Sequence, residues 1–88
     1  MSTRPTGHSH VVARIEELDA ALDRAGFSSR RKFAMSLHRW PGAPGHATVF
    51  NLWLGHVIGI DKAEVMALAL GAHVGDIFEL SNGRRIER

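Results

Sequence analysis

The stretch that decides the fold is residues 50–80, FNLWLGHVIGIDKAEVMALALGAHVGDIFEL. It contains an apolar segment that ends at Gly55, a second segment that runs from Asp61 to Gly71, and a compact turn over residues 76–78. Glycine often ends a helix because it adopts a positive φ angle without steric cost. The order of these segments therefore predicts two helices followed by a short third one.

The boundaries of the two longer helices follow from their capping residues. Thr48 is positioned to cap a helix over residues 49–54 through its hydroxyl. Asp61, followed three positions later by Glu64, makes a capping-box start for the next helix. In the turn beyond it, Phe78 is predicted to be a core residue. The inner face of the capping-box helix is predicted to consist of Val65, Leu68 and Ala69.

Two further helices are predicted upstream. The second of them is capped by Ser28 or Ser29 and ends near His38. Residues 40–45, WPGAPG, contain two prolines and two glycines and are predicted to form a loop. The first helix is predicted from apolar residues at spacings of four and three before Gly26, namely Val11, Ile15, Leu18 and Leu22. The second has a predicted inner face of Phe33, Ala34 and Leu37.

The two ends of the chain differ from the part between them. The first nine residues are rich in Ser, Thr, Gly, Pro and His and are predicted to be a flexible arm. Asn82-Gly83 is typical of a two-residue hairpin turn, so the C-terminus is either a hairpin that contacts a second subunit through residues 77–88 or a basic tail. The chain is thus divided into an arm over 1–9, a folded domain over 10–80, and a hairpin or tail over 81–88.

Length and composition limit the classes of protein to consider. Eighty-eight residues are enough for one small domain, whose limited core favours support from a second copy of the chain. The chain contains no cysteine, which excludes disulfide scaffolds and thiolate metal sites. It has no apolar signal segment at its start and no run of about 18 apolar residues. We therefore expect a soluble, cytoplasmic protein with no membrane contact.

The charge of the chain is unevenly distributed. The net charge is only +2, yet no acidic residue occurs between Asp23 and Asp61. A one-sided basic surface favours contact with phosphates, because each neutralised phosphate releases condensed counterions. The alternative is a solvated basic face with no ligand. The cations of this acid-free window are Arg24, Arg30, Arg31, Lys32 and Arg39, together with His38, His46 and His56.

The order of predicted elements over residues 28–80 resembles that of the Cro/lambda-repressor (XRE-type) family of bacterial and phage regulators. Ala34 lies midway along the helix that would position the recognition helix, where the family has an alanine. Val49 or Phe50, followed by Trp53, matches the apolar residues of the family's recognition helix. The resemblance implies an all-α, four- or five-helix lambda-repressor-like helix-turn-helix domain.

The chain departs from the family pattern in its connector. Residues 40–45 add several residues between the positioning helix and the recognition helix. Either this loop is extruded while the two helices keep their usual relation, or the helices are arranged differently. Trp40 would then cover the edge of the core or lie against the DNA backbone.

The resemblance also implies the residues that contact DNA. Asn51 is the leading candidate, because its amide can bond to N7 and N6 of adenine in the major groove; the alternative is that it only forms the polar face of the helix. The base contacts implied are His46, Ala47, Thr48 and Asn51. The phosphate contacts implied are Ser29, Arg30, Arg31, Lys32, Arg39 and His56, of which Arg30 and Arg39 are the stronger candidates. Because successive helical residues point about 100° apart, the cations at 30–32 cannot all face one duplex.

The function implied is that of a sequence-specific regulator of transcription that binds double-stranded DNA as a homodimer and acts as a repressor. The alternative is a small helical protein-binding module, antitoxin-like or host-factor-binding, that retains the same shape. Leu52 and Leu54 distinguish the two hypotheses, because a protein groove becomes an equally good target if both are exposed beside Asn51.

Other chemistries find no support in the residue pattern. The six histidines include no pair spaced four apart, so no zinc site and no other cofactor is predicted. Ser36, His38 and Asp61 are the residue types of a catalytic triad, but no nucleophile-elbow glycines surround the serine. No glycine-rich phosphate loop follows a strand. We therefore expect neither enzyme activity nor a small-molecule substrate.

Overall fold

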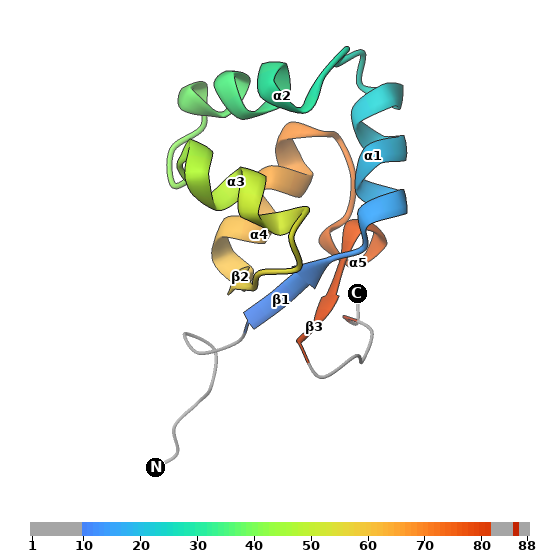
Figure 1. The fold of residues 1–88 in the computed structure, drawn as a ribbon, viewed down its shortest axis with the longest axis vertical. Helices are drawn as coiled ribbons and strands as arrows, with labels where there is room; N and C mark the ends of the chain where they lie inside the picture. The colour runs from blue at the N-terminus through green and yellow to red at the C-terminus, as the bar shows by residue number, and fades with distance from the viewer. Residues whose placement is uncertain (1–9, 82–85, 87–88) are drawn as a thin grey trace.

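The computed structural model describes residues 10–81 and residue 86, in which short helices lie above a small sheet at the lower end of the molecule (Figure 1). The first half of the chain forms β1 (His10–Ala13), α1 (Ile15–Arg24), α2 (Arg30–Ser36), the 3-10 turn η2 (Leu37–Arg39) and α3 (His46–Leu52). The second half forms β2 (Ile58–Gly59), α4 (Ile60–Ala69), α5 (Val74–Ile77) and β3 (Phe78–Leu80).

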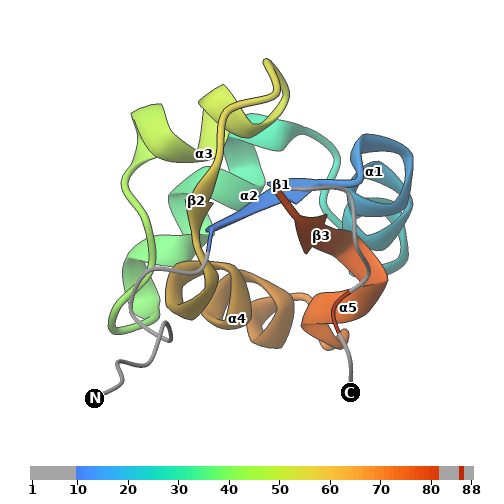
Figure 2. The same cartoon turned by 90° about the horizontal axis from the view of Figure 1, so that it is seen from below.

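The sheet joins the start of the described chain to its end. Its strand order is β2-β1-β3, and β1 is antiparallel to both neighbours. Val11 pairs with Ile58 of β2 on one side and with Leu80 of β3 on the other. The strands lie at the end of the molecule away from α2 (Figure 1), and seen from below, α4 and α5 lie along one side of them (Figure 2). Helix α4 contacts β1 and β2, and α5 contacts β3, so helices from the second half of the chain pack against the sheet.

The described chain is mostly helical but also contains a three-stranded sheet, so the prediction of an all-α fold is only partly confirmed. The prediction that Val11 belongs to the first helix is wrong. Helix α1 begins at Ile15, and the backbone N–H of Arg14 donates instead to the carbonyl of Ile77, 2.7 Å away. Val11 lies four positions before Ile15, so its spacing also fits a helix. Adjacent β-branched residues favour an extended chain, and here they find strand partners on both sides.

Helix α2 has the predicted cap and the predicted inner face. The Ser29 Oγ accepts a hydrogen bond from the backbone N–H of Lys32 at 3.1 Å, which selects Ser29 over Ser28 as the cap. All three residues of the predicted inner face are buried, namely Phe33, Ala34 and Leu37. The turn η2 carries the helical path to Arg39, close to the predicted end at His38.

Helix α3 begins earlier than predicted. Its cap is Gly45, so Thr48 lies inside the helix and does not cap it. It ends at Leu52, two residues before the predicted end. The predicted stop residue Gly55 has a φ of 90° in the turn that follows, where the N–H of His56 donates to the carbonyl of Asn51. The connector supplies the reason for the early start, since an extended glycine at position 45 lets the chain turn into a helix immediately after the loop.

Helix α4 ends as predicted at Gly71, which has a φ of 68°, but its start and its inner face differ from the prediction. Gly59 is the cap and no side chain bonds to it, so Asp61 lies in the first turn rather than in a capping box. Leu68 is 64% exposed, whereas Ala63, Met66 and Ala67 are buried. Residues 65–70 are all apolar, so periodicity alone cannot choose the face that packs.

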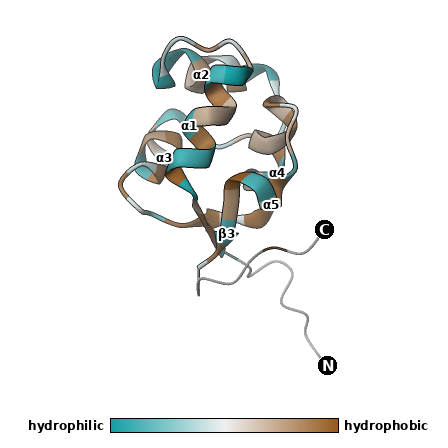
Figure 3. Cartoon of the chain, turned by 90° about the vertical axis from the view of Figure 1, so that its right-hand side faces the viewer, coloured by the Kyte–Doolittle hydropathy of each residue, from teal (hydrophilic) through white to brown (hydrophobic). Residues whose placement is uncertain are grey.

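The core lies where the helices meet the sheet. Pro44 is buried, and Trp40 and Ala43 are half-buried against the core, so the connector packs onto the domain. Helices α1 and α2 each carry hydrophilic and hydrophobic residues, as expected for helices with one buried face (Figure 3). No polar or charged residue is buried in the described part of the chain. The largest buried side chains are Phe33, Phe78, Leu18, Leu37, Leu52 and Met66.

The predictions for the two chain ends fall partly on residues that the structure describes and partly outside them. The arm over 1–9 and the Asn82-Gly83 turn lie outside the described residues. Phe78 is a core residue as predicted, and its strand pairs with β1 of the same chain. Ile86 packs against the core. Within residues 10–81 and 86, no helix has the length and apolarity needed to cross a membrane.

Candidate nucleic-acid interface

Helix α3 presents one buried face and one outward face. Val49 and Leu52 are buried, and of the predicted base-contacting residues His46 and Ala47 are exposed while Thr48 and Asn51 are half-buried. Residues three or four apart share a helical face, so residues 46, 47, 50 and 51 lie beside one another. The structure thus brings three of the four predicted base-contacting residues to the outward face of one helix.

Phe50 is the residue of this face that the sequence did not identify. It was one of two candidates for the apolar core position of the helix, but Val49 occupies that position and Phe50 is 39% exposed. An exposed phenyl ring on a recognition helix can contact the methyl group of thymine. The register of the helix decides between the two residues, and the sequence places the start of the helix three residues too late.

His46 connects the start of α3 to the end of the preceding turn. Its ring centroid is 4.9 Å from that of His38 and 6.4 Å from that of Phe50. His38 is exposed at the end of the α2–η2 segment. The sequence contains no pattern that pairs these two histidines, because the loop of residues 40–45 separates them.

The connector folds back on itself between α2 and α3. The N–H of Trp40 donates to the carbonyl of Leu37 at 2.9 Å, and the N–H of Ala43 donates to the carbonyl of Trp40 at 3.2 Å. Gly42 has a φ of 82°, a conformation that favours glycine. Trp40 therefore covers the edge of the core, the first of its two predicted roles, while the loop replaces a tight turn.

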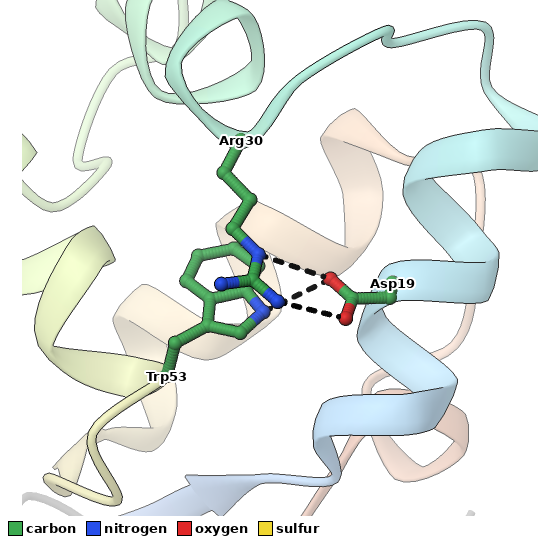
Figure 4. A network of polar contacts seen from close by, with 3 residues as sticks. All are labelled: Asp19, Arg30 and Trp53. Atoms are coloured by element: carbon green, nitrogen blue, oxygen red, sulfur yellow. Dashed lines mark hydrogen bonds and ion pairs between the residues drawn. The ribbon is translucent and has the colours of Figure 1, made fainter.

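The cations predicted to contact phosphate point in different directions. Arg31, Lys32, Arg39 and His56 are exposed. Lys32 and Arg39 line the same shallow hollow on α2 and η2, with Met35 and Ser36 between them. Arg30 instead points toward α1 and the end of α3 (Figure 4). The three consecutive cations thus divide between at least two faces, as helical geometry requires.

Arg30 belongs to a three-residue polar network that links α1, α2 and the end of α3 (Figure 4). Its Nη2 donates to Oδ2 of Asp19 at 3.0 Å, and its Nε donates to Oδ1 at 3.4 Å. The Nε1–H of Trp53 donates to the same Oδ1 at 2.9 Å. The guanidinium carbon lies 4.6 Å from the centre of the Trp53 ring, in cation–π contact.

Two opposing effects act on the Asp19 carboxylate. Burial raises its pKa and is the largest single effect, but the hydrogen bonds from Arg30 and Trp53 and the charge of Arg30 together outweigh it. The pKa of Asp19 therefore lies below its ordinary value of 3.8. The carboxylate is ionised at neutral pH and holds both partners as acceptor.

The sequence pattern does not indicate this network. Trp53 is predicted only as an apolar residue of the recognition helix, and no role is predicted for Asp19. A half-buried tryptophan does need a partner for its N–H, but the sequence does not indicate which acceptor it finds. Asp19 and Trp53 are 34 positions apart, so only the packing of α1 against α3 brings them together.

The acid-free window of the sequence becomes one continuous part of the fold. It covers α2, η2, the connector, α3 and β2, whereas every described carboxylate side chain comes from α1, α4, α5 or β3. Asp19 reaches into this region from α1 through its contact with Arg30. Residues 10–81 and 86 contain no group of three or more His, Asp or Glu side chains that could hold a metal ion.

Comparison with known proteins adds no family. The chain matches no family model, no curated protein and no solved structure.

Proposed function

We propose that this chain binds double-stranded DNA sequence-specifically through α2 and α3, and that it regulates transcription as a homodimeric repressor. The observation that carries the proposal is the outward face of α3, where His46, Ala47, Phe50 and Asn51 lie together in a region of the fold whose own elements contain no carboxylate. A helix with such a face fits the major groove, which displays a distinct pattern of donors and acceptors for each base pair.

The chemistry assigns separate roles to the two helices. The Asn51 amide both donates and accepts hydrogen bonds, as needed for N7 and N6 of adenine, and Phe50 is suited to a thymine methyl group. The exposed cations Lys32 and Arg39 would neutralise phosphates and set the position of the domain on the duplex. A dimer that covers two half-sites would repress by excluding polymerase from the same DNA.

The protein-binding alternative has one observation in its favour. Leu54 and Val57, in the turn after α3, are 73% and 47% exposed. Leu52, however, is buried, so the apolar surface beside Asn51 that this alternative required is only half present. The acid-free surface of α2 and α3 also favours phosphate as the target.

The test is selection of duplexes from a randomised DNA pool at physiological salt, followed by sequencing of the retained fraction. The proposal predicts enrichment of an inverted repeat whose half-sites are about one helical turn apart, because a two-fold dimer places its recognition helices at that spacing. Enrichment of a single half-site would support DNA recognition but contradict the dimer. A retained pool with no sequence preference would contradict the proposal and favour the protein-binding alternative.

A further inference from the structure

We propose that Asp19 is a positioning residue that determines the specificity of DNA recognition, by tying Arg30 at the start of α2 to Trp53 at the end of α3. This inference rests on the proposed function, since it concerns how α3 is held when it reads DNA. Asp19 itself would touch no base. Its effect would pass through the two partners that share its carboxylate.

Asp19 lies on α1 and contacts both Arg30 at the start of α2 and Trp53 at the end of α3. Oδ2 accepts from Arg30 at 3.0 Å and Oδ1 accepts from Trp53 at 2.9 Å, while the Arg30 guanidinium lies directly over the indole ring of Trp53 (Figure 4). Each of the three residues thus contacts both of the others. A displacement of either α2 or α3 relative to α1 breaks at least one of these contacts.

The connector between α2 and α3 explains why contacts at the ends of α3 matter. Helices α2 and α3 have only seven residues each, and they are joined by a loop with two glycines rather than by a tight turn. The orientation of α3 therefore depends on its buried face and on contacts at its ends. At its N-terminal end His46 contacts His38, and at its C-terminal end Trp53 contacts Asp19 and Arg30.

The charge of Asp19 opposes DNA binding as such. A carboxylate beside the surface that meets phosphates lowers the affinity for every duplex, whatever its sequence. Arg30 keeps free donors on Nη1, because within residues 10–81 and 86 its hydrogen bonds use only Nε and Nη2. Removal of the Asp19 charge should thus favour non-specific binding, whereas loss of the hydrogen bonds from Arg30 and Trp53 should reduce specific recognition.

The experiment measures both effects in Asp19→Asn. Dissociation constants are determined for the selected operator and for a scrambled duplex of equal length, over a range of salt, with the full chain. The matched control is Asp23→Asn, which removes the same charge one turn further along α1, where no side-chain hydrogen bond is present among the described residues. Thermal unfolding followed by circular dichroism establishes that each variant is folded.

We expect the ratio of operator affinity to scrambled affinity to fall about fivefold in Asp19→Asn, the lower end of the discrimination provided by one bidentate base contact. Binding to the scrambled duplex should be unchanged or tighter. Asp23→Asn should keep the wild-type ratio. Trp53→Phe, which retains the ring but removes the Nε1–H donor, should lower the ratio in the same direction by a smaller factor, and it provides the test if Asp19→Asn does not fold.

Three results would overturn the inference. In the first, Asp19→Asn, or Trp53→Phe in its place, keeps the wild-type ratio while the wild-type chain prefers the operator; the proposed function then stands and only the role of Asp19 fails. In the second, affinity for both duplexes falls in parallel with thermal stability, so the role is merely structural. In the third, the wild-type chain itself does not distinguish the duplexes, and the proposed function fails together with the inference.

Discussion

The sheet end of the molecule and the α2–α3 end are built in different ways. At the sheet end, Val11, Ile58 and Phe78 are buried, and backbone hydrogen bonds join the strands. At the α2–α3 end, two short helices are joined by a loop, and half-exposed polar side chains link them to α1. Both ends bury large side chains, Phe78 at the sheet end and Phe33 and Leu52 at the α2–α3 end. The difference is that backbone hydrogen bonds fix the sheet end, whereas the outward surface of α2 and α3 also depends on a few side-chain contacts.

The largest effect is expected from Phe78→Ala at the sheet end. Loss of a buried phenyl ring should lower the free energy of unfolding by about 3–5 kcal/mol, because transfer and cavity effects add. Urea unfolding measures it. Leu54→Ala, at a 73% exposed position, is the control and should change stability by less than about 0.5 kcal/mol. Equal losses in the two variants would contradict the burial of Phe78 in the core at the sheet end.

Asn51→Ala tests whether a side chain at the α2–α3 end contributes to DNA recognition but not to the stability of the fold. The variant should lose about 1–3 kcal/mol of discrimination at one base pair of the operator, with an unchanged melting temperature. Competition binding with operators altered at single base pairs measures it. Arg39→Ala is the contrasting variant, which should weaken binding to all sequences and reduce the salt slope by about 0.9. If Asn51→Ala discriminates as the wild-type chain does, α3 is not the recognition helix.

Ser29→Ala gives a smaller and purely local effect at the α2–α3 end. Loss of the hydrogen bond from the Lys32 N–H to the Ser29 hydroxyl should lower the free energy of unfolding by about 1 kcal/mol. Ser28→Ala is the matched control, since Ser28 is exposed and caps no helix in the described chain. Urea unfolding of both variants should show a loss only for Ser29→Ala, and an equal loss at Ser28 would mean that the cap is shared.

The smallest effect is the pH dependence of the Asp19 network. Because the pKa of Asp19 in the folded chain lies below 3.8, its ionised form stabilises the fold at pH values above 3.8, and this contribution is lost as pH falls through the folded pKa. The side chain is 41% exposed, so solvent screening limits the effect to less than about 1 kcal/mol. Unfolding measured between pH 2 and 6 should show less loss of stability on acidification in Asp19→Asn than in Asp23→Asn; identical curves would exclude the network as its source.

Sequence reasoning succeeded where a local rule determines the structure. Ser29 caps α2 through its own hydroxyl, and Gly55 and Gly71 end helices because their backbone conformation favours glycine. The loop at 40–45 follows from proline and glycine chemistry in the same way. Each of these features depends on residues within a few positions of one another.

The structure could not be predicted at positions where the same residue pattern fits two local structures equally well. The spacing from Val11 to Ile15 fits a helix, yet Val11 is a strand residue because Ile58 and Leu80 offer it partners. Leu68 fits the inner face of α4, yet an all-apolar segment fits any face, and the packed one carries Ala63, Met66 and Ala67. Likewise, the pattern left Val49 and Phe50 as alternatives for the inner position of α3, and Val49 occupies it because the helix starts at His46.

The sequence by itself thus determined the cap of α2, the glycines that follow α3 and α4, the loop at 40–45, and the absence of any carboxylate from residues 24–60. Only the tertiary structure decided that a three-stranded sheet closes the domain and that Asp19, Arg30 and Trp53 meet. The physical reason is distance along the chain. Hydrogen bonds and caps between neighbours are specified by the residues themselves, whereas contacts between residues 34 positions apart form only when the buried faces of the helices have packed.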